Sequence, residues 1–142
     1  MPIHAFMDAY KRVWEAQDSE GFADLFTPDG QYWNTPFQCQ DTWELRKVYW
    51  DRIKLQDNIT HSNEVLAETP NGGFAHWHTE YQVSSEELFD IWAKSTGTGL
   101  PDRKPGDPLP YLILDGTLVG QFNPEGLATE VRIWWHSRAE MP

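Results

Sequence analysis

The sequence predicts an α+β fold in which three N-terminal helices pack in a strongly curved antiparallel sheet, so that the chain forms a cone. Three observations lead to this prediction. Helical periodicity dominates residues 3–53, strand-like alternation dominates from residue 58 onward, and turn signals divide that second part into two hairpins. Helices followed by antiparallel strands stabilise each other by burying their apolar faces, which is the α+β arrangement.

The first helix is expected over residues 3–17. Its apolar side chains recur at three- and four-residue spacings and therefore fall on one stripe. This stripe consists of Phe6, Met7, Tyr10, Val13 and Trp14. A second, short helix is expected to be capped by Ser19 and to end at the turn residues Thr27-Pro28-Asp29-Gly30. The chain should then be extended over residues 31–35.

A third helix is expected to begin at Asp41-Thr42-Trp43-Glu44, which has the spacing of a capping box. It should run to about Ile53. Its expected buried stripe consists of Leu45, Val48, Tyr49 and Ile53. These residues again recur at helical spacing, which places them on one face of the helix.

Two hairpins are expected in the second half of the chain. Asn71-Gly72 is a strong hairpin signal and joins strands at 58–69 and 73–84, while Asn123-Pro124-Glu125-Gly126 joins strands at 111–122 and 127–137. In the segment 85–110, Ser84-Ser85-Glu86-Glu87 can cap a short helix, and the remainder has no apolar periodicity. A segment of this kind is a lid, a partner-binding arm or a flexible stretch. We therefore expect one domain over residues 1–142 with a lid or arm insertion at 85–110.

The composition limits the possible partners. The formal charge of −11 at pH 7 disfavours nucleic acid and anionic membranes, because binding phosphates requires a basic surface. No apolar run approaches the length of a membrane span. Cys39 is the only cysteine, so an intrachain disulfide is impossible and a reducing compartment is expected. These observations indicate a cytoplasmic protein with a small neutral ligand and no cofactor.

With these motifs, the chain resembles the nuclear transport factor 2-like superfamily, which includes ketosteroid isomerase, scytalone dehydratase, limonene epoxide hydrolase and the SnoaL-like polyketide cyclases. The resemblance rests on the helix-helix-strand opening at 10–34, on Asp41-Thr42-Trp43-Glu44-Leu45-Arg46, and on the hairpin Phe122-Asn123-Pro124-Glu125-Gly126. It covers nearly the whole chain except 85–110 and implies a cone-shaped, cystatin-like fold with one pocket. One fold of this kind hosts many activities and also proteins without catalysis.

The resemblance to ketosteroid isomerase implies several site residues. The tyrosine that donates to the substrate oxyanion falls on Tyr10, and a supporting tyrosine falls on Tyr49. The general-base position falls on Asn34, whose amide cannot move a proton at neutral pH. The protonated aspartate of the oxyanion hole falls near Leu118, which removes a second donor. We therefore expect no steroid isomerase activity, but an apolar pocket with a tyrosine pair and an amide at its mouth.

The strand at 73–84 contains the two histidines that are the best candidates for a chemical role. Side chains alternate along a strand, so His76, His78 and Glu80 share one face. The other face, called the Trp77 face, consists of Ala75, Trp77, Thr79 and Tyr81. Apolar content favours the Trp77 face as the inner one, whereas a gapless match to the isomerase favours the histidines. A slip of one residue would exchange the two faces. Both orientations stay open, and we favour the one in which His76 and His78 face the pocket.

In that orientation, His76 or His78 would act as the general acid or base that Asn34 cannot be, as a histidine does in dehydratases of the superfamily. Otherwise both histidines are surface or dimer-face residues. The pattern His76-x-His78-x-Glu80 also has the residue types of a metal site, but spacing alone is weak evidence, and we expect no metal.

The leading functional hypothesis is binding of a small, mainly apolar or carbonyl-bearing molecule, with proton transfer of the isomerase, dehydratase or cyclase type. Catalysis is assigned to His76, His78 and Tyr10. The expected ligand contacts are Trp14, Tyr32, Asn34, Tyr49, His61, Leu118 and Trp135. The alternative is a non-catalytic ligand-binding or assembly domain. In either case we expect a homodimer, because a large curved sheet leaves one face that needs cover, and Trp134 would lie on it.

Overall fold

The computed structural model describes residues 2–142. The N-terminal part is mainly helical and contains α1 (Pro2–Glu15), α2 (Ser19–Ala23), β1 (Phe26–Thr35), β2 (Gln38–Gln40), α3 (Trp43–Trp50) and the 3-10 helix η1 (Asp51–Leu55). The C-terminal part consists of long strands and one helix, namely β3 (Gln56–Thr69), β4 (Gly72–Val83), α4 (Glu86–Thr96), β5 (Tyr111–Phe122) and β6 (Ala128–Glu140). None of the described helices has the length and apolarity needed to span a membrane.

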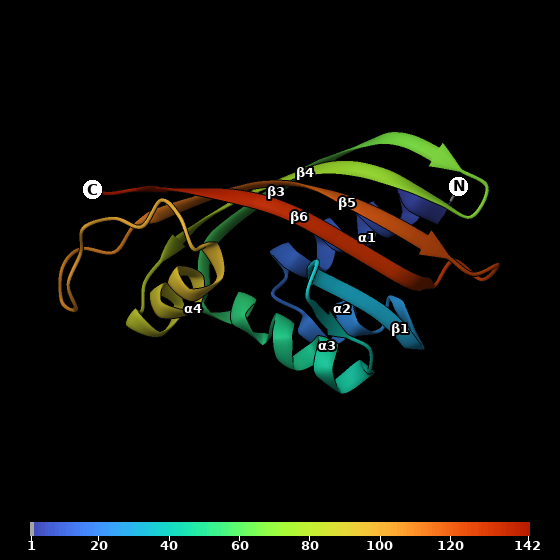
Figure 1. The fold of residues 1–142 in the computed structure, drawn as a ribbon, viewed down its shortest axis with the longest axis horizontal. Helices are drawn as coiled ribbons and strands as arrows, with labels where there is room; N and C mark the ends of the chain where they lie inside the picture. The colour runs from blue at the N-terminus through green and yellow to red at the C-terminus, as the bar shows by residue number, and fades with distance from the viewer. Residues whose placement is uncertain (1) are drawn as a thin grey trace.

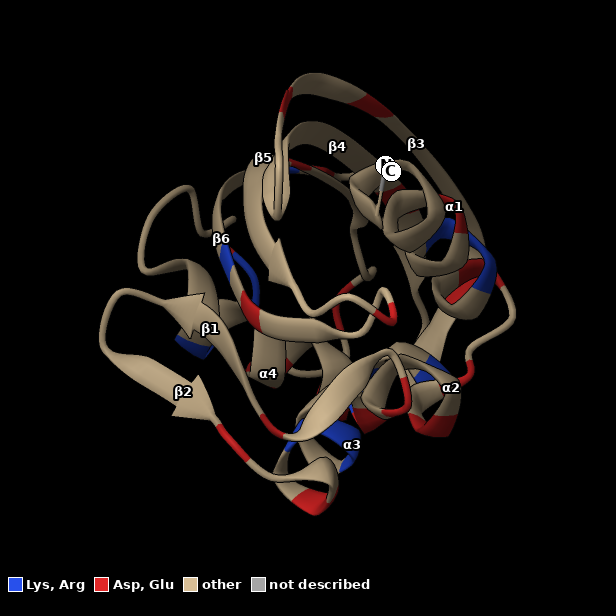
Figure 2. Ribbon diagram, turned by 90° about the vertical axis from the view of Figure 1, so that its right-hand side faces the viewer, with Lys and Arg blue, Asp and Glu red and all other residues tan. Residues whose placement is uncertain are grey.

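The strands form one curved sheet in the order β2-β1-β6-β5-β4-β3. The four long strands arch over the helices in a single layer (Figure 1). Seen from its end, the sheet curls around α1, while α2 and α3 close the opposite side (Figure 2). The predicted α+β cone is confirmed, with one difference in pairing: β1 runs parallel to β6, whereas its other neighbour β2 is antiparallel.

The core lies between the concave face of the sheet and the helices. The apolar stripe predicted for the first helix is confirmed, because Phe6, Met7, Tyr10, Val13 and Trp14 are all buried. Aromatic rings continue this core toward α2 and α3, where Phe22 and Trp50 stack with centroids 3.8 Å apart. Large rings bury much apolar area each, so this aromatic layer contributes strongly to hydrophobic stabilisation.

The buried stripe predicted for the third helix is wrong in part. Thr42 caps α3 by accepting a hydrogen bond from the Leu45 amide at 3.1 Å, one residue after Asp41, where the predicted capping box begins. However, Leu45 and Val48 are 49% and 59% exposed, while Arg46 is fully buried. The helix is therefore rotated relative to the predicted stripe, because it packs mainly on α2 and, through Arg46, on the β1 segment around Gly30.

Arg46 explains why the turn predicted at Thr27-Pro28-Asp29-Gly30 is instead part of β1. The register of β1 against β6 shifts between Phe26 and Gln31, which leaves carbonyl groups of this segment unpaired in the sheet. The Arg46 guanidinium donates to the carbonyl oxygens of Gly30 at 2.6 Å and Thr27 at 3.1 Å. A buried cation that satisfies backbone acceptors keeps the segment in the strand.

The segment after β4 contains the predicted helix and an ordered connection. The Ser85 hydroxyl caps α4 by accepting from the Leu88 amide at 3.2 Å. Residues 97–110 contain neither helix nor strand. Within them, Arg103 pairs with Glu86 and lies over the Phe89 ring, 4.5 Å from its centroid. These contacts hold the connection against α4, which in turn closes one end of the cone (Figure 1).

Candidate functional site

A cavity of about 60 Å³ lies inside the cone. Its wall is mainly aromatic and combines residues from α1, β1, α3, β4, α4 and β6, namely Tyr10, Trp14, Tyr32, Tyr49, Trp50, Trp77, Tyr81, Trp92 and Trp135. Leu88, Ile91, Leu114 and Ile133 add aliphatic surface. The wall thus has the apolar character of a small-molecule site.

Two buried hydrogen-bond donors of this wall are unused. The Tyr10 hydroxyl and the Trp77 indole Nε1 have no hydrogen-bond partner among the described residues. Both side chains are nearly inaccessible, with exposures of 0% and 1%. In contrast, the Trp14 indole donates to the Gln56 side-chain oxygen at 2.8 Å. A buried donor without a partner costs roughly 1–3 kcal/mol, so an acceptor oxygen entering the cavity would offset this cost.

The tyrosines of the wall stay protonated at neutral pH. Burial raises the pKa of Tyr10 well above its usual value, and the neighbouring hydroxyls of Tyr32 and Tyr49 raise it further. Burial also raises the pKa of Tyr32, Tyr49 and Tyr81. These groups are therefore hydrogen-bond donors and not bases. Among the described residues, no aspartate, glutamate or histidine lines the cavity.

The favoured orientation of β4 is wrong. Ala75, Trp77, Thr79 and Tyr81 face the core, so His76 and His78 lie on the outer, convex face of the sheet. The physical reason is that the Trp77 side buries far more apolar area than the histidine side.

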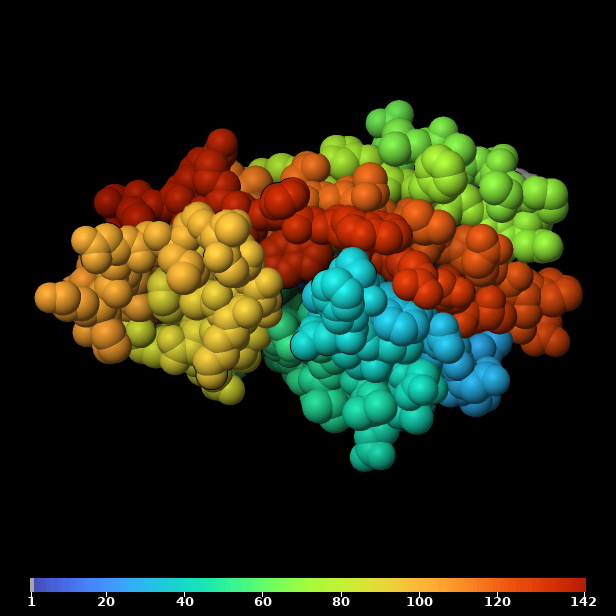
Figure 3. Space-filling model, in the orientation of Figure 1, coloured from blue at the N-terminus to red at the C-terminus, as the bar shows by residue number. Residues whose placement is uncertain are grey.

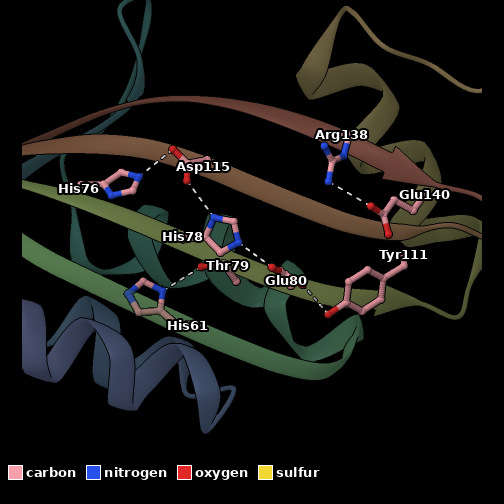
Figure 4. Close-up of polar contacts among 9 residues, drawn as sticks. All are labelled: His61, His76, His78, Thr79, Glu80, Tyr111, Asp115, Arg138 and Glu140. Atoms are coloured by element: carbon pink, nitrogen blue, oxygen red, sulfur yellow. Dashed lines mark hydrogen bonds and ion pairs between the residues drawn. The ribbon is translucent and has the colours of Figure 1, made fainter.

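On the convex face, both histidines contact one carboxylate (Figure 4). His76 Nε2 and His78 Nδ1 each lie 2.8 Å from an Asp115 oxygen, and His78 Nε2 lies 2.6 Å from Glu80 Oε2. The hydrogen bond with Asp115, followed by that with Glu80, raises the pKa of His78. Across residues 2–142, no group of three or more His, Cys, Asp or Glu side chains is arranged to hold a metal ion. The cluster is thus a surface ion pair network.

His61 lies behind the cavity wall. It packs against the rings of Tyr10 and Trp14, with centroids 5.4 Å away in each case. Its Nε2 accepts from the Asn63 amide at 2.9 Å, so its Nδ1 carries the proton and donates to Thr79 Oγ1 at 2.8 Å. Burial, followed by the charge of Lys11, lowers the pKa of His61 to about 4. The ring is therefore neutral and positions the two aromatic side chains.

The structure brings together only part of the expected ligand set. Tyr10 and four expected ligand contacts line the cavity: Trp14, Tyr32, Tyr49 and Trp135. Leu118 is fully buried in the core and, like His61, lies outside the lining. Asn34 is at the mouth, where its amide donates to the Gln38 side chain at 2.9 Å.

The cavity continues into a wider groove at its mouth. Tyr49, Arg52, Ser95 and Trp135 line both the cavity and this groove, whose volume is about 780 Å³. In the space-filling view, it appears as a hollow between the yellow α4 segment and the cyan β1–β2 hairpin (Figure 3). Sequence reasoning missed Arg52, Lys94 and Ser95, which lie here. No spacing pattern marks them, because they come from η1 and α4, which meet only in the folded chain.

Comparison with known proteins identifies the family. Residues 5–135 match the sequence model of the SnoaL-like domain, so the chain belongs to this family, as the resemblance in its motifs predicted. No curated protein matches the chain.

Solved structures agree in fold. SalBIII, an epoxide hydrolase/cyclase-like enzyme with a role in pyran ring formation in the polyether salinomycin, has a TM-score of 0.68 at 11% identity, covering 96% of this chain and 94% of that chain. RV0760c from Mycobacterium tuberculosis, in complex with estradiol-17β-hemisuccinate, has a TM-score of 0.65 at 15% identity, with coverages of 95% and 94%. The Δ5-3-ketosteroid isomerase from Mycobacterium sp. has a TM-score of 0.64 at 14% identity, with coverages of 95% and 93%. At such identities the likeness concerns the fold alone.

Proposed function

We propose that the chain binds a small, mainly apolar molecule that carries a carbonyl or another acceptor oxygen. The observation that carries this proposal is the aromatic cavity with two unused donors, the Tyr10 hydroxyl and the Trp77 indole. An oxygen that accepts from both would be recognised in a dry environment, where such hydrogen bonds are strong.

The dimensions of the site indicate how the ligand lies. The inner cavity has a volume of about 60 Å³, whereas an apolar cavity that holds benzene measures about 150 Å³. The inner part therefore accepts the narrow, oxygen-bearing end of a ligand. The remainder occupies the groove of about 780 Å³ at the mouth. Two fold neighbours support this class of ligand, because SalBIII has a role in forming a polyether and RV0760c is known in complex with a steroid ester.

Binding fits the site better than proton transfer does. The described cavity wall contains tyrosines with raised pKa values and no carboxylate or imidazole, so it lacks a group that takes up a proton near neutral pH. Proton transfer by His76 or His78 would require these side chains to cross the sheet. The convex face that holds them also exposes Phe74 and Trp134, at 43% and 45%. This apolar surface supports a homodimer that packs through the sheet.

The indole N–H resonances test the ligand proposal directly. We expect titration with 2-heptanone to shift the Trp77 indole N–H signal saturably, because the ketone oxygen accepts its hydrogen bond. Trp43 is exposed on α3 and lines neither the cavity nor the groove, so its signal should not move and serves as an internal control. Trp77→Phe assigns the signal, and Tyr10→Phe should weaken binding.

A variant that blocks the mouth of the cavity distinguishes binding inside the cavity from binding on the surface. Ser95→Phe places a ring at the shared rim and should abolish the shift, whereas Ser84→Phe makes the same change at an exposed position outside the described pockets. A Trp77 signal that never responds, or responds equally in both variants, would contradict the proposal.

A further inference from the structure

We infer that the natural ligand is a carboxylic acid, whose carboxylate binds Arg52 and Lys94 at the mouth while its acceptor oxygen lies in the cavity. This inference rests on the proposed function and adds the chemical class of the ligand. It starts from the charge of the site, since the whole chain has 22 acidic and 11 basic side chains.

The linings of the cavity and the groove have the opposite charge from the rest of the molecule. Arg52 and Lys94 line them, and no aspartate or glutamate does so in the described part of the chain. The other polar side chains of the groove are uncharged amides and hydroxyls, including Asn34, Gln38 and Gln40. In a molecule of net charge −11, a groove that contains only cations attracts an anion locally.

Arg52 is fixed at the mouth but has no counter-ion. Its Nε donates to the Tyr49 carbonyl oxygen at 2.9 Å, and its guanidinium lies over the Tyr49 ring, 3.8 Å from the centroid. Its Nη1 makes a long contact of 3.5 Å with the Ser95 hydroxyl. No described carboxylate lies within salt-bridge distance of it. The Arg52 guanidinium is thus oriented by uncharged groups, and its remaining N–H donors are available to a planar anion that binds through two oxygens.

Most other cations of the chain differ from this pair. A carboxylate partner is present for Lys11, Lys47, Lys54, Arg103, Arg132 and Arg138. Arg46 is buried and donates to backbone carbonyls, while Arg12 and Lys104, which are exposed as Lys94 is, line neither the cavity nor the groove. Arg52 and Lys94 are therefore distinguished by lining one groove together without a carboxylate partner among residues 2–142. A carboxylate matches the guanidinium fork, and Lys94 adds a second, flexible charge.

The two parts of the site together define a ligand with two polar ends. Its inner oxygen accepts from Tyr10 and Trp77, an apolar stem contacts the aromatic wall, and its carboxylate reaches Arg52. An aliphatic oxo acid has this pattern and is narrow enough for the inner cavity. Suitable probes are 4-oxopentanoate, 5-oxohexanoate and 6-oxoheptanoate, each compared with its uncharged primary amide.

Calorimetric titration of each acid and its amide tests the inference. At low ionic strength, we expect the best acid to bind about tenfold more tightly than its amide, because a charge-assisted hydrogen bond exceeds a neutral one by about this factor. High salt should reduce this preference. Arg52→Gln should abolish it by weakening acid binding far more than amide binding, Arg52→Lys should keep part of it, and Lys94→Gln should reduce it. Lys104→Gln removes an exposed charge outside the groove and should have no effect.

The outcomes separate the two proposals. Amides that bind as tightly as acids, or an acid preference that survives in both Arg52→Gln and Lys94→Gln, would overturn the carboxylate and leave the apolar ligand intact. If acids, amides and 2-heptanone all fail to shift the Trp77 indole signal, the proposed function itself is overturned. If Arg52→Gln fails to fold, the Lys94→Gln variant and the salt dependence still test whether the acid preference arises from the cations at the mouth.

Discussion

At the scale of single residues, His61 shows how burial changes the chemistry of a side chain. The ring is enclosed by Tyr10 and Trp14, with both ring nitrogens hydrogen-bonded. The neutral form is favoured because a charged imidazole would lose its hydration here. This makes His61 a structural support for the aromatic wall and couples its protonation to folding.

The coupling predicts a pH dependence of stability. The unfolded chain binds a proton at His61 below a pKa of 6.5, whereas the folded chain does so only below about 4. The contribution of His61 to the free energy of unfolding should therefore fall as the pH is lowered through this window and stay constant below it. The lost stability amounts to about 3 kcal/mol.

Urea denaturation across this pH range measures the effect. His61→Gln should flatten the slope relative to the wild type, while His136→Gln, at an exposed position, should retain it. Equal slopes for His61→Gln and the wild type would show that His61 does not titrate in this way.

Single residues also decide which segments stay in the sheet. Arg46 donates to the carbonyl oxygens of Thr27 and Gly30, in a stretch whose composition indicates a turn. Gly30 is needed there, because a Cβ at this position would lie 2.7 Å from the Ala128 carbonyl oxygen. A long-range donor and a close backbone approach thus override the local propensity.

At the scale of elements, β4 carries two unrelated surfaces. Trp77 and Tyr81 face the cavity, whereas His76 and His78 face outward next to Asp115 (Figure 4). Alternation was evident from the sequence, but it assigns residues only to two faces and does not say which face is inside.

The two faces of β4 should respond differently to substitution. The double variant His76→Ala/His78→Ala should bind 2-heptanone with unchanged affinity and lose about 1 kcal/mol of stability, because it removes only surface ion pairs with Asp115 and Glu80. Tyr81→Ala should lose about 3–5 kcal/mol, because it opens a cavity in the aromatic core. Chemical denaturation and the indole titration measure both effects. Loss of binding in the histidine variant would contradict this assignment of the faces.

At the scale of the whole molecule, the convex face remains available for a second copy. Trp134 pairs across the sheet with Thr117, which pairs in turn with His76, so these outward side chains lie in one row. Phe74 belongs to the next row along β4 and is also exposed. This is the face for which the sequence predicted a cover, and the homodimer remains a proposal.

Sedimentation velocity tests the dimer. Trp134→Glu should convert a dimer into a monomer, because it replaces a large exposed apolar side chain of the proposed interface with a charge. Val48→Glu is the matched control, since Val48 is exposed on α3, away from the long strands. A wild-type protein that is monomeric at all concentrations, or a Trp134→Glu variant that remains dimeric, would rule out this interface.

The fold could largely be predicted because its signals are local. The stripe of α1, the cap of α3 at Thr42 and the cap of α4 at Ser85 each depend on residues within one or two turns. The hairpins at Asn71 and Asn123 are equally local. Of the residues named as site candidates from the sequence, Tyr10, Trp14, Tyr32, Tyr49 and Trp135 line the cavity, and their role in binding stays a prediction.

By itself, the sequence determined the order of helices and strands, the α+β cone and the family, because periodicity, caps and turns are written in neighbouring residues. Only the tertiary structure decided that His76 and His78 face outward and that Arg52 and Lys94 meet at the mouth. Those outcomes depend on which face of a strand buries more apolar area and on elements that are distant in sequence. The position of each functional group is thus a property of the packed chain and not of its local pattern.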